Sequence, residues 1–430
     1  MNKALLLVFA SLAFAGCLDD GAGPSGAPLG VFELHCYTNA PLNPGFARVT
    51  QANGIGVTQC VVKNGVDAGN YIFSVEIPEW SEKAEQTVYL AENEVRSLDF
   101  TLTFKNKFYD NREFQPVTVR YAAEKDGTTI YTETQAANVT SGTQMIFGGV
   151  VENETFFFPF VAVQWVTPND PCIEGVISAA KELMPGRAFS DYQGYAGKSD
   201  EEKAALTMEQ AKAVYDTLQA HGMSYVNSVG TFGDPTLFSQ NVRLPHESLA
   251  TKNANCIDGT VLYAAVFEKI GLEPIIIIVP GHAFVAVRND RNSSSVTFIE
   301  TTATGTKSFE EAAYSAEQTY FEQIEGMQAG DNASMAVTID VAVARSLGVA
   351  PFPATNSQCE VNITVPSYSP GYTPDYSPAM PTMTCSDGTG NYQCSTTQPL
   401  ACIGGILFPD CFDCGCPAGS FCYYDGSCYN

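Results

Sequence analysis

The sequence is poor in basic residues. Its 430 residues include 22 Lys or Arg against 47 Asp or Glu, which gives a formal net charge of -25 and a pI near 4.4. The acidic residues are spread along the chain rather than gathered in a tail. A surface this acidic repels nucleic acid and anionic lipid headgroups. We therefore expect no nucleic acid among the partners and interpret the charge as a solvated surface.

Long apolar runs and histidine are also scarce. After the N-terminal segment, no stretch reaches the roughly 18 apolar residues of a membrane-spanning helix. The mature chain is therefore not expected to cross a membrane. Only four histidines are present, and three of them, His35, His221 and His246, have no convincing partner in the sequence. We expect neither a metal nor a cofactor.

The N-terminus has the pattern of a targeting segment. Lys3 precedes an apolar stretch of 12 residues, which is too short to span a bilayer, and Cys17 follows Ala15 and Gly16. Small residues directly before a cysteine resemble the lipobox of prokaryotic lipoproteins. The resemblance implies a signal peptide at 1–16, a lipidated Cys17 and a flexible tether at 17–30. It also implies an extracytoplasmic location at the cell surface, anchored to the membrane by the lipid. The alternative is an ordinary cleaved signal that leaves Cys17 as a spare thiol.

Residues 31–160 have the pattern of a β-domain. Alternating apolar residues predict strands at 71–77 and 95–104, and the Asp126-Gly127 pair predicts a hairpin between two further strands. Several short strands separated by turns favour an immunoglobulin-like β-sandwich. Nothing in this segment has catalytic character, so we expect a spacer or a binding module.

Helical patterns follow the β-domain. The run TMEQ at 207–210 has the pattern of a capping box that starts a helix, and Gly222 is expected to end it. Strands are then predicted between 274 and 302. This order of helices and strands predicts an α+β domain over residues 161–350.

The C-terminal part has two distinct compositions. Residues 351–384 are rich in Pro, Ser and Tyr and are expected to form an extended linker. Residues 385–430 contain eight cysteines, too densely placed for a good apolar core, which predicts a disulfide-rich module. The runs CSDGTGNYQC and CGCPAGSFC resemble small cysteine-rich modules of archaeal and bacterial surface proteins. The alternative for the close trio Cys411, Cys414 and Cys416 is a zinc site.

The residues that point to chemistry lie between 243 and 302. Cys256 follows a polar run and precedes apolar residues at helical spacing, with Gly271 and Pro274 beyond them. It is therefore predicted to begin a helix, where the dipole and the free amides favour a thiolate and can bind a developing oxyanion.

A histidine and a carboxylate follow on predicted strands. His282 begins an extended segment, and if Val287 pairs near Ser295, His282 lies opposite Glu300 to within one residue. A carboxylate in this position can orient the imidazole that activates a cysteine nucleophile. Taken singly, these residues have ordinary interpretations as a core or disulfide cysteine, a structural histidine and a solvated glutamate. Their combination predicts a catalytic arrangement.

The segments NCIDGTVLYAAVFEKIGLEP, VPGHAFVAV and FIETT resemble the transglutaminase-like superfamily over roughly residues 165–350. The resemblance implies a papain-like fold in which Cys256 is the nucleophile, His282 the base and Glu300 the orienting acid. Glutamate stands here where aspartate is commoner. Gln240 is a weaker candidate for an oxyanion donor.

The predicted function is acyl transfer or hydrolysis at amide bonds through a thioester, by a cysteine protease, an amidase or a protein-glutamine acyltransferase. The expected substrates are extracellular peptides, proteins or wall-type amides. Because the superfamily includes inactive members, the alternative is a surface binding or scaffold protein that keeps the fold. A further alternative pairs Cys256 in a disulfide with Cys172 or Cys359.

The fourteen cysteines agree with an extracytoplasmic location, because disulfides persist outside the cytosol. With Cys17 assigned to the lipid and Cys256 to chemistry, an even number remains to form bridges. Cys36 and Cys60 are expected to bridge within the β-domain. The disulfide candidates are Cys36, Cys60, Cys172, Cys359, Cys385, Cys394, Cys402, Cys411, Cys414, Cys416, Cys422 and Cys428.

Overall fold

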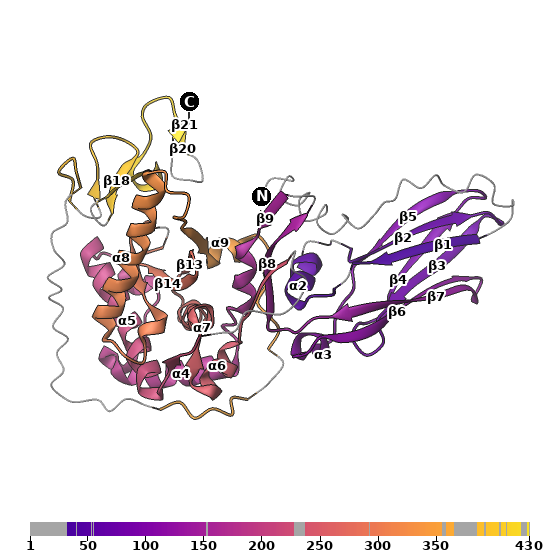
Figure 1. Cartoon of the computed structure of the whole chain (residues 1–430), viewed down its shortest axis with the longest axis horizontal. Helices are drawn as coiled ribbons and strands as arrows, with labels where there is room; N and C mark the ends of the chain where they lie inside the picture. The colour runs from indigo at the N-terminus through magenta and orange to yellow at the C-terminus, as the bar shows by residue number, and fades with distance from the viewer. Residues whose placement is uncertain are drawn as a thin grey trace. The chain divides into compact units, whose positions relative to one another are not determined.

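The computed structural model describes residues 32–39, 41–52, 54, 56–151, 154–227, 237–291, 293–354, 358–364, 385–390, 393–403, 406–409, 411–422 and 428–429. It is a mixed α/β structure with several antiparallel sheets (Figure 1). Disulfides cluster in its C-terminal part. Cys17, the predicted signal peptide and the predicted tether lie outside the described residues. Within the described ranges, no helix is both long and apolar enough to cross a membrane.

The chain folds into two compact units, each assembled from separate stretches. Unit 1 comprises Met1–Trp165, Val229–Val242 and Val343–Thr355, and unit 2 comprises Val166–Ser228, Arg243–Ala342 and Asn356–Asn430. Unit 1 therefore takes two short stretches from the region in which the sequence predicts a contiguous α+β domain.

Unit 1 contains two antiparallel sheets that pack face to face. Tyr71 stacks on Phe32 of the other sheet with ring centroids 5.5 Å apart, and the Thr38 and Tyr121 hydroxyls are 2.7 Å apart. One sheet has the order β1-β2-β5, formed by Phe32–Thr38, Thr58–Asn64 and Val95–Phe100. The other has the order β4-β3-β6-β7, formed by Ala84–Leu90, Gly69–Glu76, Gln115–Lys125 and Thr128–Val139. The predicted Asp126-Gly127 hairpin is confirmed, since Lys125 pairs with Thr128 across two residues of positive φ.

The remaining elements of unit 1 include a third sheet in the order β11-β8-β9, formed by Leu237–Asn241, Gln144–Val151 and Glu154–Phe157. Unit 1 also contains the short helices α2 (Pro44–Ala52), α3 (Asn106–Asp110) and η1 (Pro159–Trp165). Phe352, from the segment expected to be a linker, is only 5% exposed and packs edge-on against Trp165 at 4.7 Å.

Unit 2 is built around helix α7 (Cys256–Lys269) and an antiparallel sheet (Figure 1). The sheet has the order β15-β14-β13-β16, formed by Val296–Ile299, His282–Arg288, Pro274–Val279 and Val337–Asp340. Helix α7 packs against β13 and β14. Helix α8 (Phe309–Gln328) contributes Ala316 and Phe321 to a core with Ile277, Phe284 and Phe298 of the sheet.

The other helices of unit 2 are α4 (Pro171–Ala180), α5 (Asp200–His221), α6 (Pro245–Thr251) and α9 (Val341–Ser346), the last of which continues into unit 1. Short 3-10 helices form at η2 (Lys181–Leu183), η3 (Pro185–Arg187), η4 (Tyr192–Tyr195) and η5 (Thr301–Ala303). A two-stranded parallel ladder joins β10 (Ser224–Tyr225) to β12 (Asn253–Ala254).

Helix α5 begins earlier than the sequence predicts. Ser199 is its N-cap and forms a capping box with Glu202, whereas Thr207 is buried inside the helix. The Thr207 hydroxyl lies 2.9 Å from the Tyr195 hydroxyl, so the TMEQ pattern reflects tertiary packing rather than a helix start. The predicted stop is confirmed, because Gly222 caps the helix with a φ of 90°.

The C-terminal segment contains small elements tied by disulfides. Its described elements are β17 (Gln393–Cys394), β18 (Leu400–Ile403), β19 (Ile406–Pro409), α10 (Cys411–Cys414), β20 (Phe421–Cys422) and β21 (Cys428–Tyr429). The bridges that join them are Cys385–Cys402, Cys394–Cys414 and Cys416–Cys428, and Cys411 is also disulfide-bonded. The side chain of Cys422 lies outside the described part.

Two further disulfides join residues far apart in the sequence. Cys36 and Cys60 form a bridge, as expected, between β1 and β2 of unit 1. Cys172 pairs with Cys359 across a sequence separation of 187 residues, which fixes the segment around residue 359 to the start of α4. Ile363 of that segment is also buried, so part of the predicted linker is packed.

Candidate active site

Cys256 occupies the first position of helix α7, which confirms the predicted helix start. Asn255 is the N-cap: its side chain accepts from the amide of Asp258 at 2.8 Å, and the Asp258 carboxylate accepts from the Asn255 amide at 3.2 Å. This reciprocal capping box explains why the helix begins here. Cys256 is partly exposed and is the one free cysteine among the described residues.

Asp258 also fixes the chain that leads toward the helix. Its side chain is 2% exposed and accepts from the Arg243 amide at 2.8 Å. Burial raises the pKa of Asp258, while the amide bonds from Arg243 and Asn255 oppose that rise. These contacts give Asp258 a structural role in the first turn of α7.

His282 stands at the beginning of β14, directly after a tight turn. β13 and β14 form a hairpin in which Val279 pairs with His282, and Gly281 has a φ of 72° that favours glycine. The Pro280-Gly281 pair thus reverses the chain. The turn places His282 at the end of the sheet, where its side chain remains 28% exposed.

Glu300 contacts His282 directly. Its Oε2 lies 2.7 Å from His282 Nε2, and the carboxylate side chain is only 8% exposed. Because Nε2 is taken by Glu300, Nδ1 is the ring nitrogen left for Cys256, whose proximity helps to raise the pKa of His282. The structure therefore brings the three predicted site residues into one chain of contacts.

The predicted register between the two strands is wrong by two residues. Val287 pairs with Thr297 and Val285 with Ile299, so the same register carried one residue further sets Glu300 opposite Phe284. The loop closes with the Asn289 amide bonded to Ser295, which lengthens β14 through Arg288. Side chains two residues apart on a strand point to the same face of the sheet. The shift of two residues therefore leaves Glu300 on the same face as His282.

The electrostatic environment favours an ion pair. Burial by itself lowers the pKa of His282, but hydrogen bonds to Cys256 and Glu300, together with the charges of both groups, raise it to about 10. Burial raises the pKa of Glu300, yet the bond to His282, the charge of His282 and the bonds from Thr302 leave it below its usual value. An imidazolium paired with the Glu300 carboxylate is the state that these contacts stabilise.

Thr302 is a site residue that the sequence reasoning missed. Its amide and its hydroxyl donate to Glu300 Oε1 at 3.0 and 2.6 Å, and Glu300 is thereby the N-cap of η5. The signal in the sequence is an acidic residue followed two positions later by threonine at the end of a strand, a pattern typical of local side chain–backbone turns.

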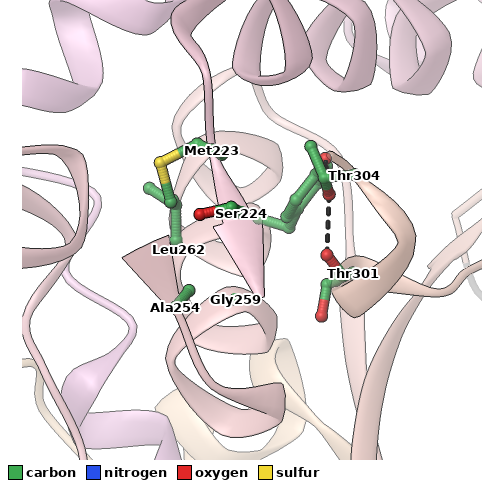
Figure 2. Close-up of a pocket in the computed structure, with 8 residues that line it drawn as sticks. Met223, Ser224, Ala254, Gly259, Leu262, Thr301 and Thr304 are labelled. Carbon is green, nitrogen blue, oxygen red and sulfur yellow. Dashed lines mark hydrogen bonds between the residues drawn. The ribbon is translucent and has the colours of Figure 1, made fainter. Parts of the chain in front are cut away.

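A small recess lies beside the first two turns of α7. It is lined by Met223 and Ser224, by Ala254, Gly259, Leu262 and Tyr263, and by Thr301 and Thr304 (Figure 2). Thr304 donates to the Thr301 carbonyl at 2.7 Å, and its hydroxyl is 2.9 Å from that of Tyr263. None of Cys256, His282 and Glu300 is among its lining residues, so the recess adjoins the elements of the site without containing the reacting groups.

Gln240 belongs to unit 1, where it pairs with Met145 in the ladder between β11 and β8. Its role as an oxyanion donor stays a prediction. Two histidines thought to lack partners do have them. His246 Nδ1 lies 2.6 Å from Asp170 Oδ2, and His221 Nε2 lies 3.1 Å from the Leu249 carbonyl.

The cysteine arrangement contradicts two alternatives drawn from the sequence. Cys172 and Cys359 bond to each other, so neither holds Cys256. Cys411, Cys414 and Cys416, the trio considered as a zinc site, are all in disulfides and offer no thiolate for zinc.

Comparison of the chain with protein-family models, with curated proteins and with solved structures found no match.

Proposed function

We propose that the chain is an extracytoplasmic cysteine enzyme that transfers or hydrolyses acyl groups of amides, with a transglutaminase-like, papain-like arrangement in unit 2. One observation carries the proposal: the free Cys256 thiol lies close enough to His282 to help raise the pKa of that imidazole, and His282 is bonded to Glu300 at 2.7 Å. A nucleophile, a base and an orienting carboxylate in this order are the requirements of nucleophilic acyl transfer.

The first half of the reaction forms a thioester. The Cys256 thiolate attacks the amide carbonyl carbon, and the carbonyl oxygen takes up the negative charge. The His282 imidazolium then gives its proton to the leaving nitrogen as the carbon–nitrogen bond breaks. Glu300 keeps the ring oriented and stabilises its charge before this transfer. In the second half, neutral His282 removes a proton from water or an amine, which attacks the thioester and releases Cys256.

The start of α7 offers donors for the oxyanion. A helix leaves its first four amides without partners inside the helix. In α7 the capping box satisfies those of Asn255 and Asp258, which leaves the amides of Cys256 and Ile257. Because these two amides belong to the same turn as the nucleophile, they are better candidates for the oxyanion site than Gln240.

The other parts of the chain fit a surface location. The disulfides of both units agree with an oxidising compartment. We propose that unit 1 is an immunoglobulin-like spacer and that Cys17 carries the lipid of a prokaryotic membrane anchor. Mass spectrometry of the N-terminal peptide from a lipoprotein-processing host tests the anchor, and an unmodified Cys17 would contradict it.

Thiol labelling of the full, unreduced chain tests the enzyme proposal. Iodoacetamide should label Cys256 faster than it labels a free cysteine near neutral pH, and His282→Ala should slow this labelling at least roughly tenfold. His246→Ala is the matched control, since that histidine also contacts a carboxylate but not Cys256. Labelling that is unaffected by His282→Ala would overturn the proposal.

Activity should be sought with a glutamine-containing protein, in the presence and absence of a fluorescent primary amine. Amine incorporation or peptide release that disappears in Cys256→Ala supports the enzyme, and an acyl adduct on the Cys256 peptide identifies the thioester. If Cys256 instead proves to be oxidised in the isolated protein, the scaffold alternative replaces the enzyme.

A further inference from the structure

The two oxygens of the Glu300 carboxylate have separate partners. Oε2 faces His282, whereas Oε1 accepts from both the amide and the hydroxyl of Thr302. The Glu300 backbone is held as well, since its amide donates to the Ala312 carbonyl of α8 at 3.3 Å. Thr302 itself is not in contact with His282 or Cys256 through any of these bonds.

These bonds restrict the conformations of the long Glu300 side chain. Glu300 must reach His282 from beyond the end of β15, and a glutamate side chain has enough rotatable bonds to point elsewhere. The Thr302 amide belongs to the backbone of η5 and would be present with any side chain. The hydroxyl, in contrast, depends on the residue at position 302 and forms the shorter of the two bonds, at 2.6 Å.

We propose that Thr302 is a positioning residue of the site, whose hydroxyl holds Glu300 Oε1 so that Oε2 is aimed at His282. The inference rests on the proposed function of the site, but it concerns a residue other than Cys256, His282 and Glu300. Without the hydroxyl, the Glu300 side chain can adopt other rotamers, and its carboxylate stabilises the His282 imidazolium less.

The charges around the carboxylate agree with this role. The Thr302 hydroxyl and amide both lower the pKa of Glu300, after the larger effects of burial and of His282. The other titratable groups that interact with this pair are Cys256 of α7, which acts on His282, and Tyr215 of α5, whose pKa is affected by Glu300.

Direct titration of His282 tests the proposal. Only four histidines are present, so histidine-selective isotope labelling of the full chain gives few NMR signals. Thr302→Val keeps the side-chain shape and should lower the pH at which His282 deprotonates by roughly half to one unit. Thr302→Ser, which restores the donor, should return it to the wild-type value. Thr306→Val is the control, since that hydroxyl bonds to the Ala303 carbonyl and not to Glu300.

Labelling of Cys256 by iodoacetamide gives a second reading. Its rate near neutral pH should fall about threefold to tenfold in Thr302→Val and recover in Thr302→Ser, because a less firmly oriented His282 activates the thiol less. Should Thr302→Val fail to fold, Thr302→Ser and Thr302→Ala, which differ only by the hydroxyl oxygen, make the same comparison.

The outcomes separate this inference from the proposed function. If Thr302→Val titrates like the wild type while Glu300→Gln shifts His282, Thr302 does not position the carboxylate and the proposed function stands. If Thr302→Ser shifts His282 as much as Thr302→Val does, packing rather than the hydroxyl is responsible, and the inference is overturned. If Glu300→Gln also leaves His282 unchanged, the proposed function fails with it.

Discussion

Glu300 reaches His282 along a diagonal of the sheet: Oε2 and Nε2 are 2.7 Å apart, although the strand register sets Glu300 opposite Phe284. The additional methylene of glutamate, relative to aspartate, allows the carboxylate to cover this offset. Side-chain length at position 300 is therefore part of the geometry of the site, and glutamate is not merely a substitute for the commoner aspartate.

Glu300→Asp should consequently behave like Glu300→Gln. Aspartate can still accept from the Thr302 amide, but its carboxylate falls short of His282, so we expect Cys256 labelling at neutral pH to slow by about tenfold or more. Labelling rates measured by mass spectrometry of the Cys256 peptide check this. Glu311→Asp, which shortens the capping carboxylate of α8, is the control. Wild-type labelling in Glu300→Asp would show that the diagonal reach is not needed.

The stability of unit 2 should depend on pH through the same pair. The pKa of His282 is raised from 6.5 to about 10, so its contribution is complete below pH 6.5 and is lost as the pH rises toward 10. The pKa of Glu300 is lowered from 4.5, so its contribution is complete above pH 4.5 and is lost as the pH falls through the lowered value. The unfolding temperatures of wild type and Glu300→Gln should therefore differ most between these limits, at pH 4.5–6.5. A difference that grows from neutral to alkaline pH would contradict the assignment.

Gly259→Ala should destabilise unit 2 and slow the labelling of Cys256. In an ordinary helix this substitution stabilises by about 0.5–1 kcal/mol. Here the added Cβ would lie 2.8 Å from Thr301 Oγ1 and 3.0 Å from Thr301 Cβ (Figure 2), which pushes on the turn between Glu300 and Thr302. We expect a net loss of roughly 1–3 kcal/mol in chemical denaturation. Gly175→Ala in α4, whose Cβ meets only Ile363 Cγ1 at 3.1 Å, is the helical control and should leave labelling unchanged.

Removal of the bridge between α4 and the segment around residue 359 should also destabilise unit 2. The double variant Cys172→Ala/Cys359→Ala opens a loop of 187 residues, and chain entropy predicts a loss of roughly 4–5 kcal/mol at most. Denaturant unfolding followed by a probe in unit 2 measures this loss. Cys36→Ala/Cys60→Ala, which opens a loop of 24 residues in unit 1, should leave that transition in place. An unchanged unit 2 transition in the first variant would refute the prediction.

Local patterns predicted local features well. The helix start at Cys256, the glycine that ends α5 and the Asp126-Gly127 hairpin were all predictable, because each depends on a few consecutive residues. The grouping of Cys256, His282 and Glu300 into one candidate site followed from the same kind of reasoning. The register between β14 and β15 did not, since the length of a polar loop does not reveal where its closing bond between Asn289 and Ser295 forms.

Features that depend on distant contacts were not predictable from the pattern. Phe352 lies in a Pro-containing stretch that resembles a linker, yet it packs on Trp165. His246 and Asp170, which bond to each other, are 76 residues apart in the sequence, and no local pattern connects them. For the same reason, the division of the chain into interleaved units could not be derived from composition alone.

The bridge between Cys172 and Cys359 bears on the order in which disulfides can form during folding. Cys256 lies between these two cysteines in the sequence, so a chain that emerges from its N-terminus presents the Cys256 thiol to Cys172 before the native partner is available. A premature bond between Cys172 and Cys256 would consume the reactive thiol and close the wrong loop. Docking of α7 onto β14 before Cys172 is oxidised would avoid this bond, and otherwise thiol–disulfide exchange must correct it.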